Sequence, residues 1–381
     1  MDLTSLPAAM AERLPRILAD IEELVRCESP SADLAAVAAS ADVVAGVGAR
    51  LVGSAPERIV IDGRTHLRWR LGDASRDEGL PRVLLLAHHD TVWPIGSLAT
   101  HPFSVDDGVL RGPGCFDMKT GLVLALHAAA QLRPCGVTIL VTGDEEVGSR
   151  TSRELIQAEA AGCRAALVLE ASADGGAVKT ARKGTSLYRV RALGRAAHAG
   201  LEPERGVNAT VELACQVLAV AGIADAGRGT TVTPTVLAAG RTFNTVPDDG
   251  AFDVDVRVWD DAEQARVDAA MRALAPATPG ARLEVTGGPN RPALSRSSSA
   301  ALFDRACALA ARLGLPPLEQ AAVGGASDGN FTAGVGTPTL DGLGAVGGGA
   351  HADHEHVLVA ELPGRAALLA ALIHDLLNEA S

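Results

Sequence analysis

The sequence predicts an α/β fold: a mostly parallel sheet with helices on both faces, into which a ferredoxin-like α+β domain is inserted. Continuous apolar runs alternate with helix-like segments through residues 83–169, which is typical of strands buried on both faces of a parallel sheet. From residue 184 the pattern changes to strands in which apolar and polar residues alternate, and after residue 293 the first pattern returns. We therefore expect a discontinuous larger domain at 1–183 and 294–381, and an inserted domain at 184–293.

The elements of the larger domain follow from hydrophobic spacing. Continuous apolar runs predict buried strands at 83–87, 137–142 and 166–169. Two less apolar strands are expected before them, at 59–61 and 66–70. Apolar residues at helical spacing predict helices at 14–25, 34–51, 121–132 and 299–313.

The inserted domain has its own order of elements. Alternating patterns predict strands at 186–193, 231–237, 251–259 and 282–286. Helical patterns lie between them at 207–221 and 263–274. The resulting order β-α-β-β-α-β is that of the ferredoxin-like unit.

Charge and composition exclude several classes of protein. The 46 acidic and 34 basic residues give a formal net charge of −12, whereas nucleic-acid surfaces carry clustered Lys and Arg. No apolar stretch of about 18 residues is free of Gly, Pro and charge, so we expect no membrane span. No basic and apolar leader begins the sequence, which indicates a cytoplasmic location. The cysteines form no CxxC pair and are expected to be buried, reduced thiols: Cys27, Cys115, Cys135, Cys163, Cys215 and Cys307.

Acidic residues and histidines follow the ends of the predicted buried strands. Asp144, Glu145 and Glu146 come after the 137–142 strand, and three acids directed at one place indicate a bound cation. The other strand-end residues are His88, Asp90 and Glu170. Because ligands of open α/β sheets gather at the carboxyl ends of the strands, we expect these side chains to converge.

Two loops add residues of the same kind. Asp117 precedes the 121–132 helix, and His351 lies in a glycine-rich loop. Nitrogen and oxygen ligands of this number suit two Zn²⁺ ions that share a carboxylate, and Co²⁺ or Mn²⁺ would also suit them. The charges agree, because two divalent cations are balanced by one hydroxide and three carboxylates: Asp117, Glu146 and Glu170.

Two acids, Asp90 and Glu145, are not needed as metal ligands. Asp90, two residues after His88, is expected to fix the orientation of the imidazole. Glu145 is then left beside the site, where a general base for the metal-bridging water is needed. Each residue alone also has an ordinary reading, as a cap, a surface acid or a loop histidine. His354 and His356 are alternatives to His351 as the ligand.

Taken together, the motifs resemble the M20 family of zinc peptidases and amidohydrolases, most closely its carboxypeptidase G2-like (glutamate carboxypeptidase) branch. The motifs follow the family's order along nearly the whole chain. They lie at 87–92, 112–119, 142–149, 169–170, 182–184, 194–200, 244–247, 324–328 and 348–351.

The resemblance implies a zinc aminopeptidase-like catalytic domain and an inserted domain that forms a homodimer and covers the site. It assigns one zinc to His88, Asp117 and Glu170. It assigns the second zinc to Asp117, Glu146 and His351, so that Asp117 bridges the two ions, with Asp90 orienting His88 and Glu145 as the base. The residues it assigns to the inserted domain are His198, which stabilises the oxyanion in the partner subunit, and Arg257 and Asn244, which bind the substrate's free carboxylate.

The leading functional hypothesis is a di-zinc hydrolase that cleaves the amide bond to an amino acid with a free carboxylate, such as a C-terminal glutamate. Its substrate would be a small peptide or an N-acyl amino acid. The alternative is a deacylase of the acetylornithine deacetylase, succinyl-diaminopimelate desuccinylase or aminoacylase type, which differs in the substrate pocket. A more remote alternative is a non-catalytic, metal-stabilised dimeric binding protein, which would need neither Glu145 nor His198. The sequence leaves open the amino acid or acyl group, the physiological metal, and the roles of Lys183 and Asp328.

Overall fold

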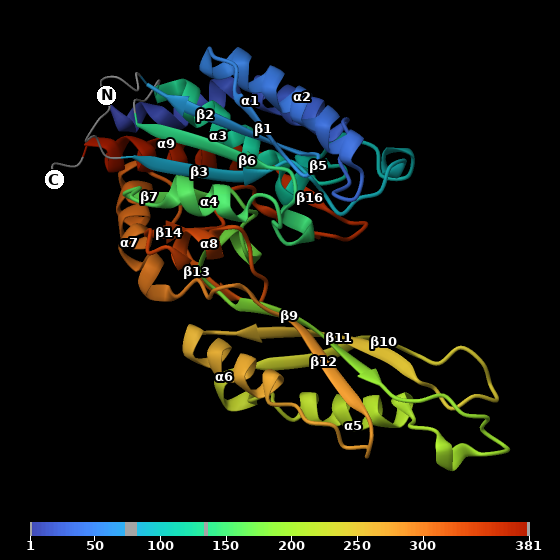
Figure 1. Cartoon of the computed structure of the whole chain (residues 1–381). Coiled ribbons are helices and arrows are strands. Elements are labelled where there is room, and N and C mark those ends of the chain that lie inside the picture. The colour runs from blue at the N-terminus through green and yellow to red at the C-terminus, as the bar shows by residue number, and fades with distance from the viewer. Residues whose placement is uncertain (1, 73–81, 133–135, 379–381) are drawn as a thin grey trace. The chain divides into compact units, whose positions relative to one another are not determined.

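The structure, a computed structural model, describes residues 2–72, 82–132 and 136–378 (Figure 1). The chain divides into two units. Unit 1 comprises Met1–Ala181, Arg296–Val323 and Ser327–Ser381, and unit 2 comprises Arg182–Ser295 and Gly324–Ala326. Both units combine helices and sheets, and the predicted α/β class with an α+β insertion is confirmed.

The main sheet of unit 1 has six strands. Their order is β1 (Glu57–Ile61), β2 (Arg64–Leu71), β6 (Val137–Thr142), β3 (Val83–His88), β7 (Ala165–Val168) and β14 (Thr339–Leu340). The pairs β6–β3, β3–β7 and β7–β14 are parallel, whereas β1–β2 and β2–β6 are antiparallel. The sheet is therefore mostly parallel, as predicted, with an antiparallel edge.

Both faces of this sheet are covered, which explains why β3 is apolar from Val83 to Ala87. Val83, Leu85 and Ala87 belong to one core cluster, and Leu84 and Leu86 belong to another. The first cluster contains residues of α1 (Leu6–Val25), α2 (Leu34–Val52), α3 (Thr120–Leu132), α7 (Arg296–Arg312) and α9 (Leu362–Asn378). The second contains residues of α4 (Arg153–Ala160) and α8 (Gly329–Gly334).

The first helix is longer than predicted. It begins at Leu6 rather than at residue 14, because Leu6 and Met10 continue the buried face toward the N-terminus. Pro15 lies inside the helix, and Leu14 and Ile17 on either side of it still pack on the core.

Helix α2 is long and apolar enough, by length and composition alone, to cross a membrane. Its Val37, Ala41, Val44 and Val47 are fully buried in the unit. Trp69 of β2 packs so closely on this helix that a Cβ at Gly48 would lie 2.3 Å from its ring. These contacts are those of a core helix.

A small antiparallel sheet that the sequence did not predict lies next to the main one. Its order is β15 (Gly347–Gly348), β16 (His356–Leu358), β5 (Val109–Arg111) and β4 (Ser104–Asp106). Because β16 pairs with β5, the loop around His351 is tied to the segment that leads into Asp117. A separate two-stranded pair joins β8 (Val178–Arg182) to β13 (Gln320–Val323).

Unit 2 has the predicted ferredoxin-like arrangement. Its elements are β9 (Gly184–Leu193), α5 (Ala209–Ala221), β10 (Thr231–Ala239), β11 (Asp249–Val258), α6 (Asp261–Arg272) and β12 (Arg282–Arg291). The sheet is antiparallel throughout, in the order β10-β11-β9-β12. Leu213 of α5 and Val267 of α6 share one core cluster with Val190 and Phe252, so both helices cover the same face.

The expectation of buried cysteines is confirmed for Cys115 and Cys163 and is wrong for Cys215, which is exposed on α5. Cys27 and Cys307 are half-buried. Cys135 lies outside the described residues.

A substitution at Gly121 tests the close approach of α3 to the end of β7. A Cβ at this position would lie 1.9 Å from the carbonyl oxygen of Leu169, the residue before Glu170. We expect G121A to lower the free energy of unfolding by about 1–3 kcal/mol, because backbone must move to admit the methyl group. Urea unfolding measures this.

The control is G46A on the exposed side of α2, where the nearest atom is the flexible end of Arg50 at 3.8 Å. That variant should gain up to about 1 kcal/mol from helix propensity, and equal effects of the two would contradict the close approach.

Candidate functional site

The first part of the site lies at the ends of two neighbouring parallel strands. His88 is the last residue of β3, and Glu170 follows the end of β7. The register pairs Leu86 with Val168, so that His88 and Glu170 extend the two strands by the same length. The Nε2 atom of His88 lies 3.5 Å from Oε1 of Glu170.

Asp117 lies between two imidazoles. Its Oδ1 is 3.4 Å from Nε2 of His88, and its Oδ2 is 3.3 Å from Nε2 of His351. Nε2 of His351 is also 3.2 Å from Oε2 of Glu146. All five side chains predicted as metal ligands therefore gather in unit 1.

The structure separates His351 from the two neighbouring histidines. His351 has a φ of 62°, in the left-handed region, and its ring meets Asp117 and Glu146. His354 is exposed, and Nδ1 of His356 hydrogen-bonds to the carbonyl oxygen of His354. The geometry supports His351, rather than its alternatives, as the residue that reaches the cluster.

These residues fit a divalent cation. Nε2 of His88 and Oε1 of Glu146 are buried without a hydrogen-bond partner among the described residues. Ligand atoms of His88, Asp117 and Glu146 lie within 4.8 Å of one another, as do those of His88, Glu145 and Glu170. Imidazole nitrogens and carboxylate oxygens in this number are the donors that Zn²⁺ and similar ions bind.

The electrostatics point the same way. Burial lowers the pKa of His88, but the carboxylates of Asp117, Asp90 and Glu170 outweigh it and hold this pKa well above its ordinary value. The carboxylates of Asp117 and Glu146 raise the pKa of His351 to about 10. In the absence of a cation, protons on the two imidazoles offset part of the negative charge of the cluster.

Asp90 has a wider role than the one predicted for it. Nδ1 of His88 is 3.5 Å from the Asp90 carboxylate but 3.0 Å from its main-chain carbonyl, which is the closer partner. The buried carboxylate also accepts hydrogen bonds from Ser31 Oγ at 2.6 Å and from the backbone N–H groups of Glu145 and Glu146 at 3.2 and 3.3 Å. Asp90 thus fixes the Glu145–Glu146 turn relative to the end of β3.

The expectation that three consecutive acids point at one place was wrong for Asp144. Its buried carboxylate accepts hydrogen bonds from the N–H and hydroxyl of Thr151 at 2.7 and 2.8 Å, and from Ser152 Oγ at 2.5 Å. The nearby hydroxyl residues Thr151 and Ser152 were the signal for this capping role. Asp328 holds both ends of the 142–149 segment, because its carboxylate accepts hydrogen bonds from the hydroxyls of Thr142 and Ser149.

A further residue, Glu355, was missed by the sequence reasoning. Its buried carboxylate accepts hydrogen bonds from the indole of Trp93 and from three backbone N–H groups between Gly114 and Asp117. Burial raises the pKa of Glu355, and these donors oppose that rise. Its place four residues after His351 was the available signal.

The other predicted residues lie in unit 2. His198 is exposed, and its Nδ1 accepts a hydrogen bond from Gly200 N–H at 3.2 Å. An isolated bridge pairs His198 with Thr245, which brings the segments of His198 and Asn244 side by side. The guanidinium of Arg257 in β11 is bound by Asp255 through Nε and Nη2, each at 2.8 Å.

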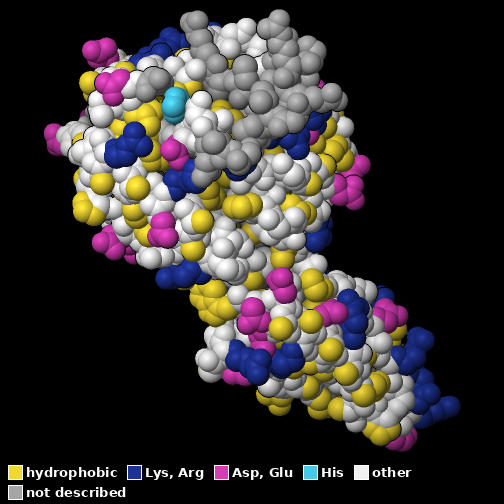
Figure 2. Space-filling model, turned by 90° about the vertical axis from the view of Figure 1, so that its left-hand side faces the viewer, with side chains coloured by type: hydrophobic (Ala, Val, Ile, Leu, Met, Phe, Trp, Pro, Cys, Tyr) yellow, Lys and Arg dark blue, Asp and Glu magenta, His cyan; other side chains and the backbone are white. Residues whose placement is uncertain are grey.

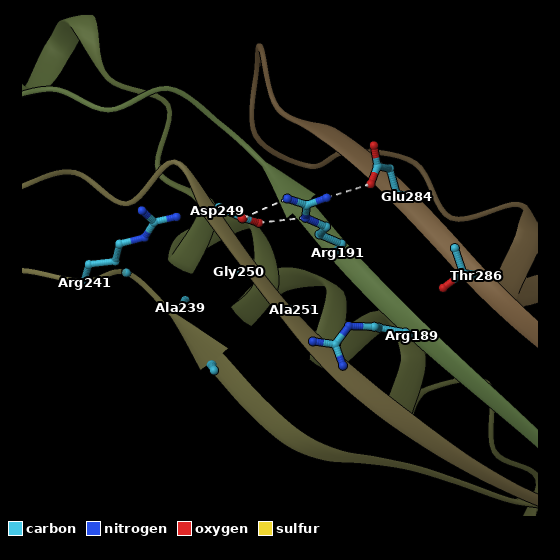
Figure 3. A pocket seen from close by; sticks show the side chains of 11 residues that line it. Arg189, Arg191, Ala239, Arg241, Asp249, Gly250, Ala251, Glu284 and Thr286 are labelled. Atoms are coloured by element: carbon cyan, nitrogen blue, oxygen red, sulfur yellow. Dashed lines mark hydrogen bonds and ion pairs between the residues drawn. The ribbon is translucent and has the colours of Figure 1, made fainter.

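A charged groove of about 580 Å³ also lies in unit 2, on the sheet face that carries alternating arginines and acids. Figure 3 shows Arg191 of β9 between Asp249 of β11 and Glu284 of β12. The groove is lined by none of the predicted site residues.

Comparisons with known proteins identify the family of the chain. The model of peptidase family M20/M25/M40 matches residues 84–375. The chain belongs to this family. M20 membership makes it a hydrolase that acts on peptide or amide bonds, as the resemblance implied.

Among the M20 relatives, carboxypeptidase G2 of Pseudomonas sp. (strain RS-16) is 31% identical over 386 residues, which cover 97% of this chain and 91% of that protein. Succinyl-diaminopimelate desuccinylase 2 of Shewanella loihica is 34% identical over 163 residues, or 38% of this chain and 42% of that protein. A crystal structure of a tripeptidase from Staphylococcus aureus has a TM-score of 0.73 and 21% identity over 96% of this chain and 99% of that one. The last likeness shows the fold.

The neutral state of His89, between His88 and Asp90, predicts a pH effect on stability. Nε2 of His89 donates to the Thr65 carbonyl at 3.0 Å, Nδ1 is buried, and burial lowers its pKa to about 4. The pKa of histidine in the unfolded chain is about 6.5. At pH values between about 6.5 and about 4, the unfolded chain therefore binds a proton that the folded protein does not, so the free energy of unfolding falls as the pH falls. Between pH 7 and pH 5 in EDTA, the wild-type protein should lose about 2 kcal/mol more than H89N.

Urea unfolding at the two pH values measures this difference. The control is H354N, which removes an exposed histidine and should retain the wild-type pH dependence. If H89N lost as much stability as the wild type, His89 would not be the buried neutral group.

Proposed function

We propose that this chain is a two-metal amide hydrolase that releases an amino acid with a free carboxylate from a small peptide, as a carboxypeptidase for C-terminal glutamate or a related residue. The observation that carries the proposal is the position of the Asp117 carboxylate between the imidazoles of His88 and His351. The similarity to carboxypeptidase G2 over 97% of the chain supports the substrate class.

The five ligands divide into two sets around Asp117. His88, which also contacts Glu170, lies at one of its oxygens, and His351, which also contacts Glu146, lies at the other. Two Zn²⁺ ions bound there, or Co²⁺ or Mn²⁺ in their place, would polarise the scissile carbonyl and lower the pKa of water.

Glu145 is proposed to move the protons. One of its carboxylate oxygens lies within 4.8 Å of ligand atoms of His88 and Glu170, close enough to contact the attacking water. Its backbone is fixed by Asp90. Glu145 accepts the proton of the water and delivers it to the leaving amine, a general base and acid in turn.

His198 is proposed to stabilise the oxyanion, supplied by a second copy of the chain. Because Gly200 N–H donates to Nδ1, the neutral imidazole carries its hydrogen on Nε2. The exposed edge of the ring is then a hydrogen-bond donor, as an oxyanion requires.

Arg257 and Asn244 are proposed to bind the free carboxylate of the substrate. Asp255 occupies Nε and Nη2 of Arg257, and it fixes the plane of the guanidinium. The remaining N–H groups at the end of the fork suit a second carboxylate.

A homodimer is part of this proposal. Hydrophobic side chains are visible on the surface in Figure 2, and unit 2 exposes several large ones. They are Leu187, Leu201, Val211, Leu218, Val236, Leu237 and Phe243. Exposed apolar side chains in this number favour contact with another protein surface.

A second candidate is a deacylase of N-acyl amino acids. It is favoured by matches to succinyl-diaminopimelate desuccinylases, which reach 40% identity over short segments of 77 residues. Such an enzyme would use the same metal ligands and base and would differ in what it accepts on the acyl side.

Replacing Glu145 with Gln tests the proton transfer. We expect E145Q to retain its metal and to lose about 10²- to 10⁴-fold in kcat, because the amide cannot accept the proton. Metal analysis and steady-state kinetics measure the two quantities. E154Q is the matched control, since Glu154 is exposed on α4. An E145Q enzyme with near-normal turnover would refute the assignment.

A substrate panel separates the two candidates. Dipeptides and N-acyl derivatives with C-terminal glutamate should be cleaved with a higher kcat/KM than N-succinyl-diaminopimelate and N-acetylornithine. Methyl esters of the same glutamate substrates are the control, because they lack the free carboxylate. A preference for the succinyl or acetyl compounds would favour the deacylase.

A further inference from the structure

The carboxylate of Glu355 is buried and accepts four N–H donors. Oε1 accepts from Phe116 N at 2.8 Å and from Asp117 N at 3.0 Å. Oε2 accepts from Trp93 Nε1 at 2.6 Å and from Gly114 N at 3.0 Å. Both oxygens therefore serve as acceptors.

The four donors come from two segments that lead to the candidate metal ligands. Trp93 follows His88 and Asp90 in the loop after β3, and the three backbone donors belong to the loop that carries Asp117. Glu355 itself lies four residues after His351. One buried carboxylate thus joins the segments of His88, Asp117 and His351.

The loop before Asp117 leaves little freedom for another arrangement. Gly114 has a φ of 69°, and a Cβ there would lie 2.4 Å from Thr91 Cγ2. The backbone N–H groups of this tight loop are directed toward Glu355, and buried donors need an acceptor.

We propose that Glu355 is a positioning residue that holds the Asp117 loop in place for cation binding. This rests on the proposed function, which makes Asp117 the shared ligand. Because Glu355 accepts the N–H of Asp117 itself, a shift of this bond moves the carboxylate that both imidazoles contact. The negative charge of Glu355 also adds to the attraction for cations.

The E355Q variant tests the role of the second acceptor oxygen. Glutamine has the same shape, but its NH₂ group would face two N–H donors that it cannot accept. The affinity for Zn²⁺ should fall by about 10- to 100-fold, as for other residues that hold metal ligands in place. Competition with a chelator of known affinity measures it, and the visible absorption of the Co²⁺-loaded protein should change.

A merely structural role would leave a different signature. If Glu355 only stabilised the fold, E355Q would lower Tm by the same amount with and without Zn²⁺. If E355Q weakens metal binding, the rise in Tm that Zn²⁺ produces is also smaller than in the wild type. D353N is the matched control. Asp353 lies two residues before Glu355, carries the same charge, and has a side chain that is 90% exposed. The D353N variant should bind Zn²⁺ as the wild type does.

The outcomes separate this inference from the function on which it rests. Wild-type affinity in E355Q, or an equal loss in D353N, would overturn the role of Glu355 and leave the metal site intact. A wild-type chain without Zn²⁺ affinity would overturn the proposed function itself. If E355Q does not fold, E355D decides: the shorter carboxylate should weaken Zn²⁺ binding, and native affinity in E355D would overturn the inference.

Discussion

The mutual repulsion of carboxylates at one edge of a sheet is the constraint on which the rest of unit 1 depends. Asp117, Glu145, Glu146 and Glu170 bring oxygens within a few ångströms of the same imidazole, in a region largely closed to water. Positive charge relieves this repulsion, and the same carboxylates raise the pKa values of His88 and His351. The folding of this edge and its affinity for cations therefore have the same origin.

A second set of carboxylates makes the first set possible. Asp90, Asp144, Asp328 and Glu355 are buried, and each accepts hydrogen bonds from the loops that carry the ligands. They are satisfied by N–H and O–H donors, so they cost less to bury than unpaired acids would. These hydrogen bonds add to the pairing of β16 with β5 in fixing the loops.

The sequence was sufficient where position follows from regular structure. His88 and Glu170 could be placed together because parallel strands of known direction end at the same edge, and the apolar runs before them are unambiguous. The ferredoxin-like order of unit 2 could be read from alternation in the same way. The convergence of Asp117 and His351 rested on the family resemblance, since no periodicity describes their loops.

Side-chain direction was the information that the sequence lacked. Asp144 and Glu145 are adjacent acids, yet one caps a turn and the other faces the cluster, because neighbouring side chains leave the backbone in different directions. The role of Glu355 could not be predicted for the same reason: three of its four donors are backbone N–H groups, which leave no mark in the residue types. The small β15-β16-β5-β4 sheet was missed because strands of two or three residues are too short for a pattern.

The residues proposed for catalysis are divided between the two units, and the division has a physical basis. Cation ligands require fixed positions, which the main sheet and its satisfied carboxylates supply. Substrate contacts need groups that stay exposed until substrate arrives, as His198 is. The bidentate pair of Arg257 with Asp255 shows how unit 2 meets both needs, because one carboxylate orients the guanidinium while its outer N–H groups remain available. A hydrolase built in this way can alter its substrate range in unit 2 without disturbing the charge balance that the metal ligands require.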